Sequence, residues 1–213
     1  MKNEFEAIFF YTRNDYLIVN NLLLNNLTNI KSLMEVVNKD YKGMIDEMKA
    51  NPAGRLGLKD KELAQDIFNR YKKRFQEKID VEKTLNRARE DITNLHKLLS
   101  PATQTMILHR NIKNKHFVDF ENKTKYEYKA FSSCLQKPTD IIYSYGPKDK
   151  YIELIIEVPQ NFPIIEIDNL PQFIQNEEGE IILPPFLANI TKIEKVNNGK
   201  CDAKIYLQLN KSF

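Results

Sequence analysis

The hydrophobic pattern of the chain changes near residue 100 from helical spacing to short strand-like runs, and this change constrains the fold more than any other feature. Between residues 60 and 99 apolar side chains recur every three or four positions, which is the spacing of one face of an α-helix. The series begins with Leu63, Ile67, Tyr71, Phe75 and Ile79. It predicts one long amphipathic helix that begins at Asp60 and ends before Ser100-Pro101.

A second helical pattern covers residues 30 to 50 and ends in the breaker N-P-A-G-R-L-G at 51 to 57. After residue 100, β-rich runs alternate with Pro, Gly, Asn and Asp. These runs are residues 105–110, 126–133, 151–158, 164–167, 180–183, 189–196 and 203–209. Helices followed by strands predict an α+β fold, with an N-terminal helical lobe at residues 1–100 packed on a mixed, mainly antiparallel sheet at 101–213. We expect the two parts to form a single domain.

Composition excludes several classes of protein. Hydrophobic residues make up 42% of the 213 residues, which is enough for a folded core. Acidic residues interrupt the first ten positions, and no run approaches the roughly 18 apolar residues of a membrane span. We therefore expect no signal peptide, no membrane partner and a cytoplasmic location, in the producing cell or in a target cell after delivery. The net charge of +3, with acids interleaved among the bases, does not demand a nucleic-acid surface.

Cysteine and histidine usage argues against a structural metal. Cys134 and Cys201 are the only cysteines, and we expect both to be reduced thiols. The three histidines, His96, His109 and His116, stand apart from any C-x-x-C pair and lack zinc spacing. The sequence therefore predicts no metal cofactor.

An acidic cluster precedes one of the apolar runs, in N-E-E-G-E-I-I-L-P-P-F at 176 to 186. Strand alternation would place Glu178 and Glu180 on one face, with Cα atoms about 6.5 to 7 Å apart. Carboxylates that close raise each other's pKa, which suits a division of labour between a base and an electrostatic stabiliser. Gly179 between them lets another group approach the backbone. The alternative is a solvated acidic turn before a buried strand.

Polar residues end two other runs. Arg110 follows the apolar stretch 105–109, where its guanidinium could grip a phosphate or carboxylate, or could pair with a structural acid. Ser132 and Ser133 could donate to a ligand or hold a carboxylate, although serines often end strands. His109 alternates to the face opposite Arg110, where packing is an alternative to chemistry. No G-x-S-x-G motif is present, which argues against a serine hydrolase.

Taken in order, these motifs resemble those of the mono-ADP-ribosyltransferases of the arginine–serine–glutamate (R-S-E) class, whose last motif is E-x-E. The matching stretches are I-L-H-R-N (107–111), F-S-S-C-L (131–135) and E-G-E-I-I-L-P-P (178–185), preceded by I-E-L-I-I-E-V-P-Q-N-F-P (152–163). Y-L-I-V-N-N-L-L (16–23) is similar to a motif of the family's helical lobe. His109, Asn111 and the pair Ser133-Cys134 depart from the usual residues. The basic helical segment 59–99 is unmatched, and it either selects a target or is a solvated face.

The resemblance implies a split β-sandwich fold and a site that binds NAD as co-substrate, in a cleft between the helical lobe and the sheet. Glu180 would stabilise positive charge on the ribose as nicotinamide leaves and would hold a ribose hydroxyl. Arg110 would clamp the NAD phosphate or ribose region, and Ser132 would orient Glu180 and the ribose. His109 and Ser133 would complete the cofactor site.

The resemblance also implies the acceptor. Glu178 would orient and partly deprotonate an arginine side chain of a target protein. Phe173 could offer an aromatic face to that guanidinium, or could anchor its loop. A nucleic-acid acceptor is a less expected alternative. The family also includes ectoenzymes, but the expected absence of a signal peptide and of a disulfide framework argues against that group and favours a phage or bacterial toxin or effector. An NAD glycohydrolase and a non-catalytic binding module with the same fold remain alternative functions.

Overall fold

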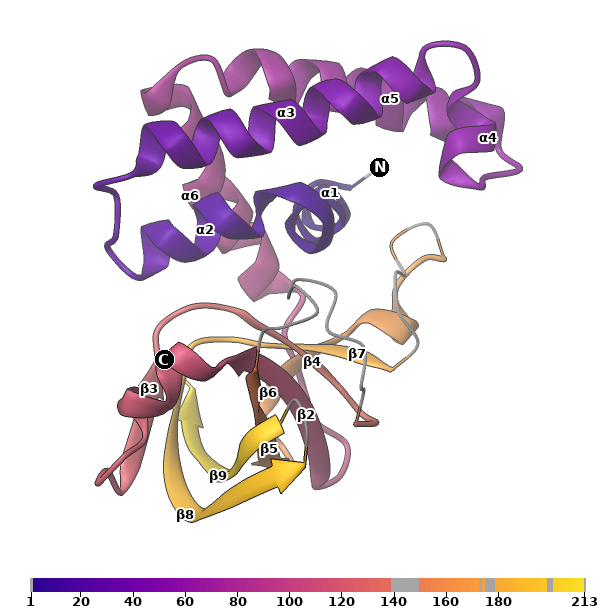
Figure 1. Ribbon diagram of the computed structural model, residues 1–213. Helices are drawn as coiled ribbons and strands as arrows, with labels where there is room; N and C mark the ends of the chain where they lie inside the picture. Colours follow the sequence, from indigo (N-terminus) through magenta and orange to yellow (C-terminus); the bar gives the residue numbers. More distant parts are fainter. Residues whose placement is uncertain (1, 139–149, 173, 175–178, 199–200, 213) are drawn as a thin grey trace. The chain divides into compact units, whose positions relative to one another are not determined.

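The computed structural model describes residues 2–138, 150–172, 174, 179–198 and 201–212 (Figure 1). The chain divides into two compact units, residues 1–98 with 171–174 and residues 99–170 with 175–213. The division follows the change from helical to strand-like sequence near residue 100. Whether the two units act as a single domain stays a prediction. Among the described residues, no helix is long and apolar enough to cross a membrane.

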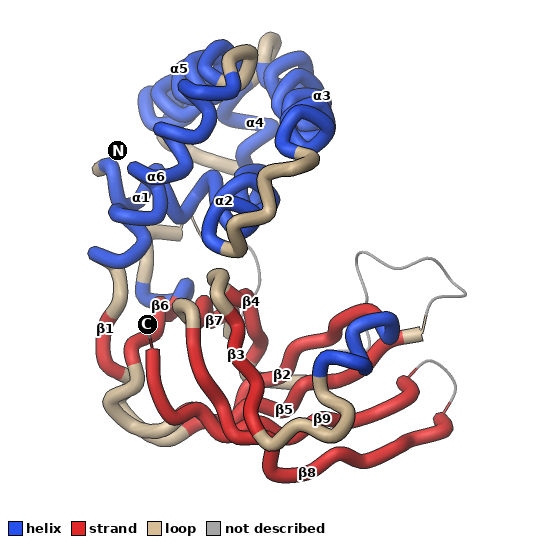
Figure 2. The backbone as a smooth tube through the Cα atoms, turned by 90° about the vertical axis from the view of Figure 1, so that its left-hand side faces the viewer, coloured by secondary structure: helices blue, strands red, loops and turns tan. Residues whose placement is uncertain are grey.

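Helices build the first unit (Figure 2). They are α1 Asn3–Phe10, the π-helix η1 Tyr11–Asp15, α2 Tyr16–Leu23, α3 Ile30–Met48, α4 Pro52–Leu56, α5 Lys61–Glu77 and α6 Val81–Lys97. The helix predicted at 30 to 50 is confirmed as α3, which packs on α5, while α1 packs on α6. The predicted breaker at 51 to 57 contains the short α4, with Pro52 at its start and Gly57 in the left-handed conformation at its end.

The prediction of a single long helix after Asp60 is wrong, because the chain forms two helices there, α5 and α6. Asp60 caps α5 as predicted, since its carboxylate accepts hydrogen bonds from two backbone amides of the first turn. Asp80 caps α6, since its carboxylate accepts a hydrogen bond from the backbone amide of Lys83. Ile79 fits the apolar stripe by spacing but is 73% exposed in the connection. The second N-cap satisfies an amide of the new helix, and this local contact outweighs continuation of the stripe.

Charged side chains form a buried cluster inside the helical unit, and we call it the Arg74 network. Arg74 is 1% exposed and pairs with three carboxylates: Glu6 at 3.0 Å, Asp15 at 2.6 Å and Asp91 at 2.8 Å. Lys78 also pairs with Asp15, at 3.1 Å. The carboxylates come from α1, from the last residue of η1 and from α6. The network therefore ties together segments from both ends of the helical unit.

The second unit contains a sheet of nine strands among the described residues, in the order β1-β6-β7-β4-β2-β5-β9-β8-β3. The strands are β1 Ser100–Pro101, β2 Met106–Lys113, β3 Lys125–Tyr128, β4 Ser132–Leu135, β5 Tyr151–Val158, β6 Pro163–Glu166, β7 Glu180–Leu183, β8 Phe186–Asn198 and β9 Cys201–Ser212. Of the strand pairs formed by the described residues, only β5 with β9 is parallel. The predicted α+β class with a mixed, mainly antiparallel sheet is confirmed.

The strand predicted at 126 to 133 is wrong in its extent, because two strands occupy this region. β3 pairs with β8 at one end of the sheet, whereas β4 lies between β2 and β7. Ala130 and Phe131, between the two strands, are both fully buried. The chain leaves the sheet between Tyr128 and Ser132 because the two strands pair at different places, β3 with β8 and β4 with β2 and β7.

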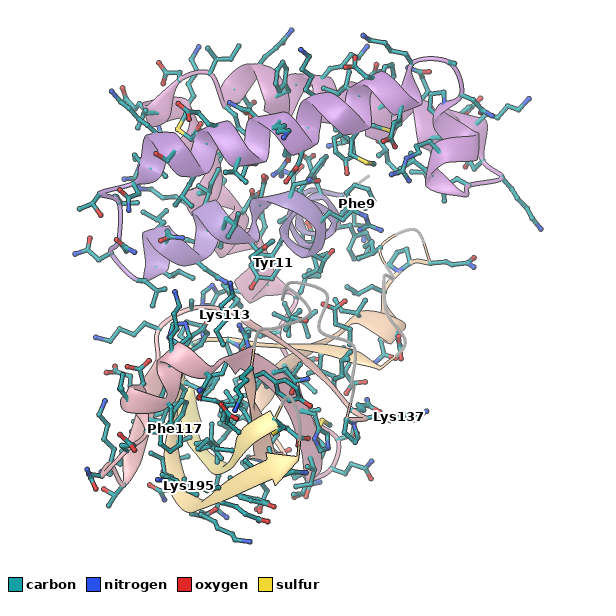
Figure 3. All side chains as sticks on the ribbon, viewed as in Figure 1. Phe9, Tyr11, Lys113, Phe117, Lys137 and Lys195 are labelled. Atoms are coloured by element: carbon teal, nitrogen blue, oxygen red, sulfur yellow. The ribbon has the colours of Figure 1, made fainter. Side chains whose placement is uncertain are left out.

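One face of the sheet carries the hydrophobic core, which includes Leu108, Ile152, Leu154, Ile156, Ile181, Leu183, Ile205 and Leu207. The 3-10 helix η2 (Asn114–Asp119) lies close to β8, since Lys195 Nζ is 5.9 Å from the ring centroid of Phe117 (Figure 3). Side chains alternate along each strand, so the core residues fix the direction of their neighbours. This alternation decides where the candidate site residues point.

Candidate functional site

Arg110 projects from β2 on the same face as the core residue Leu108. The strand continues to Lys113, so the prediction that Arg110 ends its strand is wrong. Its pairing with β5 continues as far as Lys113, and this pairing keeps the strand extended past the arginine. Arg110 Nη1 donates a hydrogen bond to Ser132 Oγ and, at 3.5 Å, to the backbone oxygen of Ser133. The guanidinium is therefore tied to the neighbouring strand β4.

An aromatic ring supports the same guanidinium. The Cζ atom of Arg110 lies 5.4 Å from the ring centroid of Tyr128, at the end of β3. Three strands separate β2 from β3 in the sheet order, so this contact means that the sheet curls over its core. A cation held over an aromatic face is attracted by the ring's electrons. Sequence reasoning missed Tyr128, because the contact joins strands that are not neighbours.

Glu180 is the first residue of β7 and is 7% exposed. Its Oε1 accepts a hydrogen bond of 2.8 Å from Ser133 Oγ. In the antiparallel pairing of β4 with β7, Leu135 lies opposite Glu180. Ser133 precedes Leu135 by two residues in β4, so both point to the same face. Ser133 and Glu180 therefore share a face of the sheet, which brings their side chains together.

The two adjacent serines serve different partners. Consecutive side chains of a strand point to opposite faces, so Ser132 meets Arg110 on the core face and Ser133 meets Glu180 on the other. The sequence predicts that Ser132 orients Glu180, whereas in the structure Ser133 makes this hydrogen bond. Arg110 and Glu180 thus project from opposite faces, and β4 links them. Strand alternation in the sequence could have distinguished the two serines, because Ser132 shares a face with the apolar Cys134 and Ser133 points to the opposite face.

His109 points away from Arg110, as strand alternation predicts. Its Nδ1 lies 2.9 Å from Glu153 Oε1, and Lys204 Nζ lies 3.0 Å from the other oxygen of this carboxylate. Glu153 thereby orients the imidazole ring from the neighbouring strand β5. A role for His109 in binding the cofactor stays a prediction.

The acceptor residues Glu178 and Phe173 lie outside the described residues, and their roles stay predictions. The residue between the two glutamates of the E-x-E pattern, Gly179, is described and has a φ of +73°. This left-handed conformation is accessible to glycine at little cost. A residue with a side chain would be strained at this position, directly before β7.

The site contains a cysteine without the character of a nucleophile. Cys134 Sγ lies 3.6 Å from Ser132 Oγ in the interior of β4. Burial raises the pKa of the Cys134 thiol, so the group stays protonated at neutral pH. Within the described ranges, no group of three or more His, Cys, Asp or Glu side chains could hold a metal ion. The functional groups available at this site are therefore the carboxylate of Glu180 and the guanidinium of Arg110, on strands that β4 joins.

No family model and no curated protein matches this sequence. Solved structures do match. The ADP-ribosyltransferase Vis of Vibrio splendidus, in complex with agmatine, is 15% identical over 99% of this chain and 75% of that chain, with a TM-score of 0.52. The C3 exoenzyme of Clostridium limosum is 15% identical over 99% and 86%, with a TM-score of 0.52.

A third match is the enzymatic component C2-I of the Clostridium botulinum C2 toxin. It is 14% identical over 99% of this chain and 44% of that chain, with a TM-score of 0.52. Identities this low establish similarity of fold. The chain therefore has the α+β fold of the ADP-ribosyltransferase Vis, the C3 exoenzyme and C2-I.

Proposed function

We propose that this protein is an NAD-dependent mono-ADP-ribosyltransferase that transfers ADP-ribose to an arginine of a target protein and releases nicotinamide. The observation that carries the proposal is the hydrogen bond from Ser133 to Glu180, which orients the second glutamate of the E-x-E pattern at the start of β7. Arg110 stands two strands away in the sheet order and is joined to the same β4. The fold shared with Vis supports the proposal.

The reaction needs a fixed negative charge beside the ribose. As the bond between the anomeric carbon and nicotinamide breaks, its electron pair leaves with neutral nicotinamide and positive charge develops on the ribose. The carboxylate of Glu180, already oriented by Ser133, would stabilise that charge without reorganising. This is the carboxylate logic of glycoside hydrolysis, which also breaks a bond at an anomeric carbon.

Arg110 would bind the anionic part of NAD. A guanidinium matches the geometry of phosphate oxygens and stays charged at all physiological pH values. Ser132 and the ring of Tyr128 restrict the rotation of this side chain before any ligand arrives. A clamp ordered in advance loses less entropy on binding.

The acceptor would be a guanidinium held by Glu178. A nitrogen of the arginine attacks the anomeric carbon and forms the new C–N bond, and the proton that it loses passes to the Glu178 carboxylate. Vis is recorded in complex with agmatine, whose guanidinium group is that of arginine. This complex supports an arginine-like acceptor for the present chain.

Agmatine provides the direct test. The protein is incubated with NAD labelled in the adenine ring, with and without agmatine. The products are then separated and identified by mass spectrometry. We expect labelled ADP-ribosyl-agmatine and free nicotinamide. Free ADP-ribose formed at the same rate with or without agmatine would instead identify an NAD glycohydrolase. Calorimetry that detects NAD binding, with no product of either kind, would identify a binding module.

Glu178→Gln should separate transfer from hydrolysis. The amide keeps the size of the side chain but cannot take the proton of the acceptor guanidinium, so we expect transfer to agmatine to fall about 100-fold, within the usual range for loss of a general base. NAD hydrolysis, in which water attacks, should fall much less. Glu177→Gln, one position earlier, is the matched control and should keep both activities. Undiminished transfer by the Glu178 variant would refute the arginine assignment.

The two serines should differ in their effects on NAD cleavage. Ser133→Ala removes the hydroxyl that orients Glu180, so we expect kcat to fall by roughly 10-fold or more while the KM for NAD changes little. Ser132→Ala removes the contact to Arg110, so its main effect should be a higher KM. Steady-state kinetics with NAD and agmatine measures both parameters. The reverse assignment of kcat and KM effects would contradict the observed division between the serines.

A further inference from the structure

We propose that Asp168 is a positioning residue for the reaction, because it holds the backbone of Gly179 and thereby the carboxylate of Glu180. The Oδ2 atom of Asp168 accepts a hydrogen bond of 3.0 Å from the backbone N–H of Gly179. Asp168 belongs to the 3-10 helix η3 (Ile167–Asn169), which follows β6 directly. The proposal rests on the proposed function, since it assigns catalysis to Glu180.

The register of the sheet explains this contact. β6 and β7 are antiparallel, with Ile165 opposite Ile182 and Glu166 opposite Ile181. Extending the same register by two residues places Asp168 opposite Gly179. The backbone has turned into η3 by then and no longer offers a ladder partner, so the side chain of Asp168 takes the place of a main-chain acceptor.

The other side of Gly179 is held by β4. The backbone N–H of Gln136 donates to the oxygen of Gly179 at 3.1 Å, one residue beyond the pair formed by Leu135 and Glu180. Both polar groups of the Gly179 backbone are therefore bound, one by each neighbouring segment. The φ of +73° is thus fixed from two sides.

Glycine needs such a brace more than other residues do, because it adopts positive and negative φ with similar ease. Without the Asp168 carboxylate, Gly179 could rotate and carry the first residue of β7 with it. A hydrogen bond to an ionised acceptor is roughly twice as strong as a neutral one, so a carboxylate suits this task. A shift of about 1 Å in a reacting group can cost a large factor in rate. Asp168 therefore acts on the rate through Gly179, without contact with NAD.

Three variants test the effect on the reaction with NAD and agmatine. Asp168→Ala removes the acceptor, and we expect kcat to fall about 10-fold with the KM for NAD within about twofold of wild type. Asp168→Asn keeps an oxygen that can accept from Gly179, so its kcat should stay within about threefold. Glu166→Ala is the matched control, because it removes the carboxylate that accepts a hydrogen bond from Asn169 in the same segment, and its kcat should be unchanged.

An independent measurement follows the contact itself. Gly179 is the only one of the six glycines that follows a glutamate in the sequence. Labelling glycine with 15N and the glutamate carbonyl with 13C therefore gives a single amide signal in a carbonyl-edited NMR spectrum. We expect this signal to move and to exchange faster with solvent in Asp168→Ala, and to stay near its wild-type position in Asp168→Asn and Glu166→Ala.

The outcomes are distinguishable. If the Gly179 amide signal is unchanged in Asp168→Ala, the contact is overturned. If the signal moves while kcat stays at the wild-type value, the positioning role is overturned. Equal loss of kcat in Asp168→Asn and Asp168→Ala would also overturn it, since the amide can still accept the hydrogen bond. A wild-type protein that cleaves no NAD would overturn the proposed function and the catalytic part of this proposal together, while the NMR signal would still report the contact.

Discussion

Glu180→Gln is expected to lower the rate of nicotinamide release by about 10²- to 10³-fold, the range seen when one preorganised electrostatic contact to a transition state is removed. The amide has the size of the carboxylate, and its oxygen can still accept the hydrogen bond from Ser133. What it loses is the negative charge opposite the developing positive ribose. The loss should therefore appear in kcat, measured as nicotinamide released from NAD with and without agmatine.

The matched control is Glu157→Gln in β5, another strand of the same sheet. Glu157 Oε1 accepts a hydrogen bond from the side chain of Gln208, so this variant also replaces a hydrogen-bonded glutamate by its amide. We expect its activity to equal that of wild type. Calorimetry should show that Glu180→Gln still binds NAD. A Glu180→Gln enzyme that labels the acceptor at the wild-type rate would remove Glu180 from the chemistry and with it the proposed function.

Local patterns in the sequence were sufficient to predict the class of fold. The runs at 151–158 and 180–183 coincide with β5 and β7, because short, mainly apolar runs rich in isoleucine and bounded by turn residues favour buried strands. Arg110, Ser132, Ser133 and Glu180 were found through their order along the chain. Their pairing could not be found in this way, because it depends on the register between β2, β4 and β7, which are far apart in sequence.

The helical unit shows a different limit of sequence reasoning. Arg74 lies in the segment that we expected to be either a target-selecting or a solvated basic face, yet it is almost fully buried. Burial of an arginine requires carboxylates, and those of Glu6, Asp15 and Asp91 come from distant parts of the chain. Helical spacing alone carries no information about such partners. It also gave no sign that Asp80 would begin a new helix.

The buried cation leads to the largest expected effect on stability. Arg74→Met replaces the arginine by an unbranched apolar side chain. The carboxylates of Glu6, Asp15 and Asp91 then stay in the interior without their shared guanidinium. Removing one partner of a buried ion pair typically costs about 3–5 kcal/mol, because the remaining charge stays desolvated. We expect a loss of that size in the free energy of unfolding of the helical unit. Chemical denaturation followed by the helical circular dichroism signal measures it.

Lowering the pH should reduce the stability that Arg74→Met loses relative to wild type, and the pKa values of the buried carboxyls give the direction of this effect. Burial alone would raise the pKa of Asp15, but the charges of Lys78 and Arg74 outweigh it and hold the pKa below its usual value. Arg74 and Arg70 do the same for Glu6. A carboxyl with a lowered folded pKa stabilises the fold above its unfolded pKa, and this contribution is lost as the pH falls through the folded pKa.

In Arg74→Met the cation is gone and burial should dominate, so the folded pKa values of the same carboxyls should rise. A group with a raised folded pKa favours the folded state more as it becomes protonated. Asp91 already has a raised pKa through burial, which Arg74 only partly offsets, and losing Arg74 should raise it further. The stability difference between wild type and variant should therefore shrink as the pH is lowered from neutral toward about 4, the usual carboxyl range.

Arg89→Met is the matched control, because Arg89 lies exposed on α6, which also supplies Asp91, and donates only to Asn86 among the contacts described for it. A surface change of this kind is expected to alter the free energy of unfolding by less than about 0.5 kcal/mol at every pH. If Arg74→Met matched this control, the Arg74 network would contribute no net stability. If its loss were large but independent of pH, lost packing of the guanidinium against the ring of Phe10, 4.2 Å away, would explain it better than the stranded carboxylates.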